Sequence, residues 1–474
     1  MPRNVLLSAV ILAALVSAPL HAADHPPNIV FILADDLGYA ELGCYGQTLI
    51  KTPNIDSLAR EGMRFTQYYS GHPVCAPSRC ALLTGFHSGH GAVRDNKEIG
   101  EWKSWQGQWP LPADTRTVAH ILKERGYATA CVGKWGLGAV GSSGEPAKMG
   151  FDLFFGVNCQ RQAHNYYPTY LTRNGDTILL DGNDGESPTG KHYAPDLMID
   201  EALGFIQQNK EKPFFLYFAT PVPHVALQVP DDSLAEYGDA LDSKAYDGKD
   251  GYQPHPKPHA AYAAMITRMD RDIGRMLKTL SDLGLEKNTI VFFASDNGPT
   301  FNGGTDSKFF KSAGVFRGLK QQVYEGGIRV PLVARWPGHI AAGQTSEQIA
   351  AAWDILPTLA EIAGAAQPAN IDGLSLAPTL FGQPGQKQHA YFYWESGSLE
   401  GGEQAVRMGD WKGERFGLRK NADAPIQVYN LKDDPSEVRD LAAKNPEMAA
   451  KLLDLMKSAH TPSRDFPLFA GEKR

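Results

Sequence analysis

Three aspartates and one asparagine stand in two short runs far apart in the sequence, Asp35-Asp36 and Asp296-Asn297. Each run directly follows an apolar stretch, so we expect both at the ends of buried strands. Carboxylates brought that close together cannot all stay ionised without compensation. A hard divalent cation supplies it, and Ca²⁺ or Mg²⁺ suits the set better than zinc because no histidine or cysteine joins it. Either pair alone is common in turns and helix caps, but the two placed alike favour a metal site.

A second run that could carry chemistry extends from Pro73 to Gly85 and contains Cys75-Ala-Pro-Ser-Arg79. We expect a loop that enters a helix, with Pro77 near the first helical position. The free N–H groups and positive dipole end of that helix would favour an anion beside Cys75, and Arg79 would add a permanent positive charge. Taken alone, Cys75 is equally compatible with a buried thiol or one half of a disulfide.

Strands and helices must bring these residues together. Four short apolar runs, each followed by polar residues, are typical of strands buried on both faces of a parallel sheet. They are residues 28–34, 127–132, 214–219 and 289–294. Helical patterns fall between them, at 55–61, 115–125 and 259–283. We therefore expect an α/β fold with a doubly wound, mostly parallel sheet flanked by helices, and ligands bound beyond the carboxyl ends of the strands.

The chain divides by pattern into three parts. Residues 1–22 have the charged start, apolar stretch and small-residue end of a signal peptide, so we expect a periplasmic or secreted protein. Residues 23–385 hold the strands and motifs of a catalytic domain. A linker at 382–388 leads to residues 386–474, where short alternating runs and a final helix near 446–459 predict a smaller α+β subdomain.

Composition narrows the class of protein. The 474 residues are 42% apolar and 21% charged, with a formal net charge of −7. That balance argues against a nucleic-acid binder, which normally carries a basic surface. No apolar run after the leader is long enough to span a membrane. Five cysteines are too few for a disulfide scaffold. Gly/Pro-rich segments at 138–150, 181–190 and 238–258 are expected to cover the ligand-binding edge.

The run Cys75-Ala-Pro-Ser-Arg79, followed by Leu83-Thr84-Gly85, resembles the signature of the type I sulfatases of the alkaline phosphatase superfamily, in particular arylsulfatases and N-acetylgalactosamine-6-sulfatases. Further motifs of that family match in the same order, over roughly residues 25 to 460. They are Asp35-Asp36, Gly133-Lys134-Trp135, Ser295-Asp296-Asn297-Gly298, Lys320, Glu325-Gly-Gly-Ile-Arg329-Val-Pro331 and Asp433-Asp434-Pro435.

The resemblance implies hydrolysis of sulfate monoesters by a modified residue on a metal. A maturase would convert Cys75 to formylglycine before the protein folds and is exported, and one hydroxyl of the hydrated aldehyde would attack sulfur. Its second hydroxyl would then allow the aldehyde to re-form and sulfate to leave. One divalent cation, Ca²⁺ ahead of Mg²⁺, would be bound by Asp35, Asp36, Asp296, Asn297 and modified residue 75.

The same resemblance gives roles to four further side chains. Arg79 and Lys134 would orient the diol, and Lys134 and Lys320 would face the sulfate oxygens. His224, between prolines and an apolar run, would protonate the leaving-group oxygen, although a histidine in such a loop is often an ordinary loop residue.

One position departs from the family pattern. Many members read G-K-W-H-L-G, whereas this chain has Gly136 where the histidine would stand. The missing imidazole is the one usually credited with helping the intermediate to collapse. His259 and Asp296 are candidates to replace it.

The substrate follows less directly from the sequence. Arg94 and Asn96, which follow the signature helix, and His164, in a polar and aromatic loop, are candidate substrate-binding residues. We expect a sulfated carbohydrate of the galactose or N-acetylgalactosamine type. Two alternatives remain open: a phosphatase or phosphodiesterase of the same superfamily, which the signature at Cys75 disfavours, and a non-catalytic sulfated-glycan binder, suggested only by Gly136.

Overall fold

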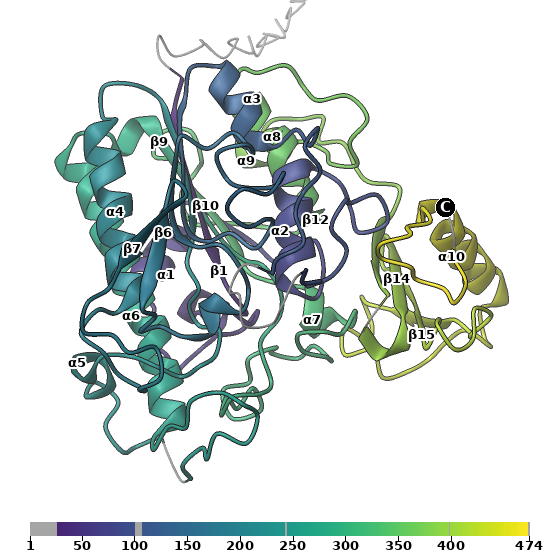
Figure 1. The fold of residues 1–474 in the computed structure, drawn as a ribbon. Helices are drawn as coiled ribbons and strands as arrows, with labels where there is room; N and C mark the ends of the chain where they lie inside the picture. The colour runs from purple at the N-terminus through teal and green to yellow at the C-terminus, as the bar shows by residue number, and fades with distance from the viewer. Residues whose placement is uncertain (1–25, 100–106, 242–243, 398, 473–474) are drawn as a thin grey trace, which may run out of the picture.

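The computed structural model describes residues 26–99, 107–241, 244–397 and 399–472 (Figure 1). The signal peptide expected at 1–22 lies outside the described residues. The chain forms one large sheet between two layers of helices, with a smaller sheet at the C-terminal end. Among the helices of the described residues, none combines the length and the apolar character needed to cross a membrane.

The large sheet has ten strands in the order β11-β2-β10-β9-β1-β8-β4-β5-β6-β7. Its five central strands are parallel and include all four predicted runs, so the predicted parallel arrangement is confirmed at the centre. They are β1 (Asn28–Ala34), β4 (Ala128–Lys134), β5 (Leu153–Val157), β8 (Phe214–Ala219) and β9 (Thr289–Ser295).

The outer strands make the sheet mixed. At one side β10 runs antiparallel to β9 and to β2, while at the other side β6 and β7 continue antiparallel from β5. Only β11, at the far edge, is again parallel to its neighbour. The bounds are β2 (Met63–Phe65), β6 (Tyr170–Arg173), β7 (Asp176–Leu179), β10 (Leu332–Arg335) and β11 (Gln344–Ser346). A separate short pair joins β3 (Tyr68–Tyr69) to β12 (Ala350–Ala351).

Helices cover both faces of the sheet because successive side chains of the buried strands point to opposite faces. In β1, Val30 and Ile32 pack into one hydrophobic cluster, and Phe31 and Leu33 into the other. The first cluster is covered by α1 (Pro53–Arg60), α4 (Ala194–Gln208) and α6 (Pro258–Asp282). The second is covered by α2 (Cys75–Thr84), α3 (Val118–Glu124) and α8 (Ile355–Ile362) (Figure 1). Short helices α5 (Asp231–Leu234), α7 (Glu325–Ile328) and α9 (Ala377–Leu380) lie in the connections.

The C-terminal region forms the predicted α+β unit. Four antiparallel strands pair in chain order, and α10 (Pro446–Ala459) packs on them. The strands are β13 (Phe392–Ser396), β14 (Glu403–Met408), β15 (Trp411–Phe416) and β16 (Gln427–Asn430). Trp394 of β13 joins this sheet to the larger part, because its indole N–H donates to the carbonyl of Ser70 at 2.9 Å.

A buried lysine ties β15 to the large domain. The Lys412 ammonium lies 2.7 Å from Glu437, 3.1 Å from Glu414 and 3.1 Å from Glu325 at the start of α7. All four side chains are buried, so this ammonium supplies much of the positive charge that stabilises the three carboxylates.

We expect Lys412→Met to lower the free energy of unfolding by about 3–5 kcal/mol, because it leaves buried carboxylates without their cation. Thermal and denaturant unfolding measure the effect. The matched control is Lys457→Met, whose ammonium makes only an exposed pair with Asp454 at 3.7 Å, and which should change stability by less than about 1 kcal/mol. Equal stability of the two variants would refute this view of Lys412.

Candidate active site

The carboxyl ends of the central strands bring the predicted residues to one edge of the sheet. Asp35 and Asp36 follow β1, Lys134 ends β4, and His224 lies in the loop after β8. Asp296 follows β9, paired in register with β1. All of these side chains are buried. Parallel pairing of distant strands thus gathers residues that are far apart in the sequence.

The turn after β1 has a strained backbone that fixes the two aspartates. Asp36 has a φ of 67°, a left-handed conformation that non-glycine residues seldom adopt. Its N–H donates to Asp296 Oδ1 at 3.1 Å, and the next N–H, of Leu37, donates to Ser295 Oγ at 2.9 Å. These hydrogen bonds hold the ends of β1 and β9 together.

Each aspartate is paired with one cationic side chain. Lys134 Nζ lies 2.6 Å from Asp35 Oδ2, and Lys320 Nζ lies 2.7 Å from Asp36 Oδ2. Arg79 donates to Asp296 Oδ2 through both Nε, at 3.0 Å, and its terminal nitrogen, at 2.7 Å. Three buried negative charges therefore face three positive ones.

These surroundings shift the pKa values of Asp35 and Asp296 in opposite directions. Burial alone would raise the pKa of Asp35, but the neighbouring positive groups, led by Lys134, hold it well below its usual range. Burial and the nearby charge of Asp35 raise the pKa of Asp296 to about 7. Burial therefore disfavours the ionised form of Asp296, although three cationic side chains match the three aspartates in number.

Cys75 is the first residue of α2 and points into the carboxylate cluster. Its Sγ lies 3.3 Å from Asp35 Oδ1 and 3.8 Å from Asp36 Oδ1. Asn96 Oδ1 accepts a hydrogen bond from the N–H of Ala76 at 2.8 Å, which satisfies a free donor of the first helical turn. The helix begins two residues earlier than predicted, with Pro77 as its third residue, where no intrahelical N–H is lost.

The Cys75 thiol is not activated by its surroundings. Burial, and then the charge of Asp35, raise its pKa far above the ordinary value. All five cysteines lie in the described part of the chain, and none forms a disulfide. Cys75 is therefore a neutral thiol in this site, and a neutral thiol is a poor nucleophile.

The donor set fits a hard divalent cation. Asn297 Oδ1 is buried and has no hydrogen-bond partner, although the amide nitrogen of the same side chain donates to Asp36 Oδ1 at 2.7 Å. The expectation that no histidine or cysteine joins the set is wrong in geometry, because ligand atoms of Asp35, Asp36, Cys75 and His224 lie within 4.8 Å of one another. The oxygen atoms still outnumber the other donors once Asn297 and Asp296 are included. An orphaned carbonyl oxygen beside crowded carboxylates is what Ca²⁺ or Mg²⁺ would satisfy.

His224 and Lys320 form a pair above the cluster. His224 Nδ1 donates to the carbonyl of Val225 at 2.5 Å, so its Nε2 is free to accept from Lys320 Nζ at 3.1 Å. Burial and the charge of Lys320 hold the pKa of His224 well below its ordinary value. The imidazole is therefore neutral, with Nε2 turned toward the ammonium.

An aromatic stack extends outward from His224. The ring of His164 lies 4.8 Å from that of His224, nearly parallel at 11°. The ring of Tyr252 lies 5.3 Å from that of His164 and is tilted by 55°. His164 thus connects the catalytic edge to the segment 238–258. The glycines and prolines of that segment predicted that it covers the ligand-binding edge, but nothing in the sequence pattern indicated a role for Tyr252.

Gln160 fills the space beside Gly136. A Cβ at Gly136 would lie 2.2 Å from Gln160 Nε2, and Gly136 has a φ of 77°. Both polar atoms of the Gln160 amide are buried without a hydrogen-bond partner. The side-chain amide of Gln160, from the loop after β5, therefore occupies the space that a side chain at position 136 would need. The sequence alone did not predict this contact.

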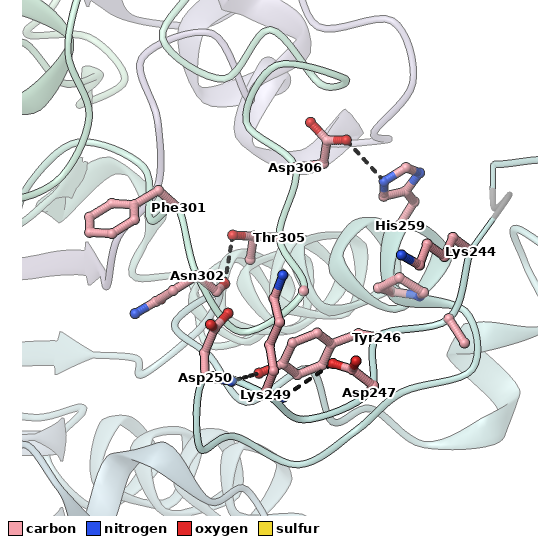
Figure 2. Close-up of a pocket in the computed structure, with 13 residues that line it drawn as sticks. Lys244, Tyr246, Asp247, Lys249, Asp250, His259, Phe301, Asn302, Thr305 and Asp306 are labelled. Atoms are coloured by element: carbon pink, nitrogen blue, oxygen red, sulfur yellow. Dashed lines mark hydrogen bonds and ion pairs between the residues drawn. The ribbon is translucent and has the colours of Figure 1, made fainter.

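Three of the expected residues lie outside the cluster. Arg94 is directed to the C-terminal subdomain, where it pairs with Glu395 at 2.8 Å and donates to the carbonyl of Thr461 at 2.6 Å. His259 contacts the carbonyl of Leu241 at 2.7 Å and the carboxylate of Asp306 at 3.4 Å (Figure 2). Asn96 supports the helix that carries Cys75, as described above.

Comparison with known proteins gives a consistent picture. Residues 27–365 match the Sulfatase family, and residues 314–461 match the family described as N-sulphoglucosamine sulphohydrolase, C-terminal. Arylsulfatase A of Homo sapiens is 34% identical over 96% of this chain and 91% of its own length. N-acetylgalactosamine-6-sulfatase of Rattus norvegicus is 34% identical over 82% of this chain and 71% of its own.

A solved structure is similar throughout. The crystal structure of Ps i-CgsB in complex with k-i-k-neocarrahexaose superposes with a TM-score of 0.76 and 29% identity, covering 92% of each chain. The fold, the family match over most of the chain and the full-length relatives agree. The chain therefore belongs to the sulfatase family and is a sulfuric ester hydrolase with an alkaline-phosphatase-like fold.

Proposed function

We propose that the protein removes sulfate from a carbohydrate, with formylglycine at position 75 as nucleophile and one divalent cation held by Asp35, Asp36, Asp296 and Asn297. The observation that carries this proposal is the position of Cys75 Sγ, 3.3 Å from Asp35 Oδ1 and 3.8 Å from Asp36 Oδ1. An oxygen in place of that sulfur would join a set of oxygen ligands that suits Ca²⁺ ahead of Mg²⁺.

The modified residue and the cation would supply the chemistry that the unmodified chain lacks. When present, formylglycine hydrate offers one hydroxyl for attack and a second for release of sulfate, and the cation polarises the sulfate group. The chain's own contribution is to place the residue: α2 holds it at the helix start, and Asn96 secures the first turn.

The cationic side chains would bind the sulfate. Arg79, Lys134 and Lys320 balance the three aspartates, so a bound divalent cation leaves the pocket positive and favours a monoanion. Lys134 and Lys320 now pair with Asp35 and Asp36, and both ammonium groups would turn toward sulfate oxygens once a cation takes those carboxylates.

His224 would deliver the proton to the leaving oxygen. Besides burial, the charge of Lys320 is one cause of the low pKa of His224, so once Lys320 turns toward the sulfate, His224 would take up a proton from solvent on Nε2. It would donate that proton to the leaving alkoxide and return to the neutral form, with its Nδ1–H still bound to the carbonyl of Val225. A sugar alkoxide is a poor leaving group, and this protonation matters most for such esters.

The relatives and the expected leader support the proposed substrate class and compartment. N-acetylgalactosamine-6-sulfatase and a structure with bound neocarrahexaose support a sulfated glycan of the galactose or N-acetylgalactosamine type. We propose that His164, whose ring stacks on that of His224, contacts that sugar. Residues 1–22 support export, after a maturase has acted on Cys75.

We expect Asp35→Asn to lose the bound cation and at least about 100-fold of the activity, because it removes an anionic ligand from the centre. Elemental analysis of the purified protein and release of inorganic sulfate report the two losses. Asp433→Asn, at an exposed position of the C-terminal subdomain, is the control and should retain both. A variant that kept one equivalent of metal and full activity would contradict the metal assignment.

A second prediction concerns the modification. In protein made with a maturase, the tryptic peptide ending at Arg79 should contain an aldehyde in place of the Cys75 thiol and resist alkylation. Cys80, which begins the next peptide, should alkylate after unfolding and serves as an internal control. Mass spectrometry distinguishes the two. Fully active protein with an intact Cys75 thiol would disprove the nucleophile.

A third prediction tests the proton donor. His224→Ala should lower kcat/KM for a sugar sulfate by at least about 100-fold, and far less for 4-nitrophenyl sulfate, whose phenolate leaves without protonation. The exposed His339→Ala is the control and should leave both substrates unaffected. Equal losses on the two esters would show that His224 does not protonate the leaving group.

A further inference from the structure

The C-terminal segment, residues 460–472, follows α10 and contacts the loop 94–98 of the large domain. It is drawn in yellow in Figure 1. Arg94 donates to the carbonyl of Thr461 at 2.6 Å, and Lys97 Nζ donates to the carbonyl of Asp465 at 3.0 Å. The two side chains stand two residues before and one residue after Asn96. The C-terminal segment therefore holds this loop on either side of Asn96.

Asn96 joins the loop to the backbone that carries residue 75. Its Oδ1 accepts the N–H of Ala76 at 2.8 Å, and Ala76 directly follows residue 75 at the start of α2. The first N–H groups of a helix have no partner within the helix, so an acceptor from outside fixes this turn. A continuous series of contacts thus connects the C-terminal segment to the position of residue 75.

The Lys97 ammonium has partners in both parts of the structure. Besides its hydrogen bond to Asp465, it lies 4.0 Å from the ring centroid of Trp109 and 5.4 Å from that of Phe466. The two rings meet edge to face, with their centroids 5.7 Å apart. An ammonium group over aromatic faces is attracted by the rings, so Lys97 binds the C-terminal segment to the large domain.

Four charged side chains are buried where the C-terminal segment leaves α10. His460 Nδ1 lies 2.7 Å from Glu395, and its Nε2 lies 3.5 Å from Glu472. Arg94 pairs with the same Glu395 at 2.8 Å, and none of the four side chains is more than 9% exposed. Glu472 also closes the segment on itself, because its carboxylate accepts the N–H groups of Ser463, Leu468 and Phe469. Two positive groups match two negative ones when His460 is protonated.

The surroundings of His460 favour its protonated form. Burial alone would lower its pKa, but the hydrogen bond to Glu395 and the charges of Glu395 and Glu472 raise that pKa above the ordinary value, against the opposing charge of Arg94. Tyr393 also donates to Glu395, at 2.5 Å, and burial raises the pKa of that phenol well above the ordinary value. The charged imidazole therefore links β13 to the C-terminal segment.

We propose that the C-terminal segment is a clasp that positions the nucleophile, with Arg94 and Lys97 as positioning residues that act through Asn96. The inference rests on the proposed role of residue 75 as nucleophile and adds a distant part of the chain on which its reactivity depends. Since a misplacement of about 1 Å at a reacting atom can cost about 100-fold in rate, a loosened clasp should lower kcat more than it raises KM.

The first test removes the ammonium and then restores it. For Lys97→Met we expect kcat for 4-nitrophenyl sulfate to fall about tenfold, with KM within about twofold of the parent value, and Lys97→Arg should recover most of kcat. Phe466→Leu, which removes the aromatic face from the C-terminal segment, should act in the same direction as Lys97→Met. Lys420→Met, at an exposed position, is the control. Mass spectrometry of residue 75 allows kcat to be given per modified enzyme.

A double-mutant cycle and hydrogen exchange separate positioning from a general loss of stability. In an Asn96→Ala background, Lys97→Met should lower kcat by less than about twofold further, whereas independent effects would multiply. Overlapping peptides that differ by Ala76 report the exchange of its N–H. That exchange should be about tenfold faster in Lys97→Met than in the parent, and close to the parent rate in Lys97→Arg.

Two outcomes would overturn the inference while leaving the sulfatase function intact. One is an unchanged kcat in Lys97→Met, and the other is a pair of losses that multiply in the cycle. If the parent enzyme released no sulfate, the proposed function would fail instead. Exchange of the Ala76 N–H would then decide on the clasp alone, since the inference requires faster exchange in Lys97→Met than in Lys420→Met.

Discussion

Three aspartates buried at one edge of a sheet can coexist only where positive charge compensates them, and the architecture of this protein follows from that constraint. Parallel pairing of β1 with β9 places Asp36 and Asp296 side by side, and the N–H of Asp36 donates to Asp296 Oδ1 at 3.1 Å. Arg79 from α2, Lys134 from β4 and Lys320 from a distant loop then supply the three cations. A divalent cation would take over part of this compensation and release ammonium groups to bind sulfate.

The same compensation explains the position of residue 75. Its Sγ approaches the only side of the carboxylate pair that the lysines leave open, Oδ1 of Asp35 and Oδ1 of Asp36. Burial keeps the thiol neutral, so the unmodified residue has neither the charge nor the nucleophilicity that the reaction needs. His224 and His164, whose rings lie 4.8 Å apart, continue the site from this cluster toward the segment that contains Tyr252.

The central strands were predictable from sequence because a strand buried on both faces is a continuous apolar run, as in 28–34 and 214–219. The polar residues after those runs predicted the catalytic edge, because the carboxyl ends of parallel strands meet at one edge of a sheet. Side-chain partners that depend on loop paths were not predictable. Arg94 was expected near the substrate but pairs with Glu395 of the C-terminal sheet, and Gln160 fills the space at Gly136 through a loop whose path no periodicity encodes. The antiparallel outer strands likewise carry too few residues to show a pattern.

The most direct test of the account is a crystal structure of the matured enzyme grown with Ca²⁺. We predict a single cation within about 2.3–2.6 Å of oxygens from Asp35, Asp36, Asp296 and Asn297, with an oxygen of formylglycine 75 completing the set. Lys134 and Lys320 should then have turned from the aspartates toward the substrate side. A fully active enzyme whose aspartates keep their direct pairs with Lys134 and Lys320, with no cation between them, would contradict the central claim.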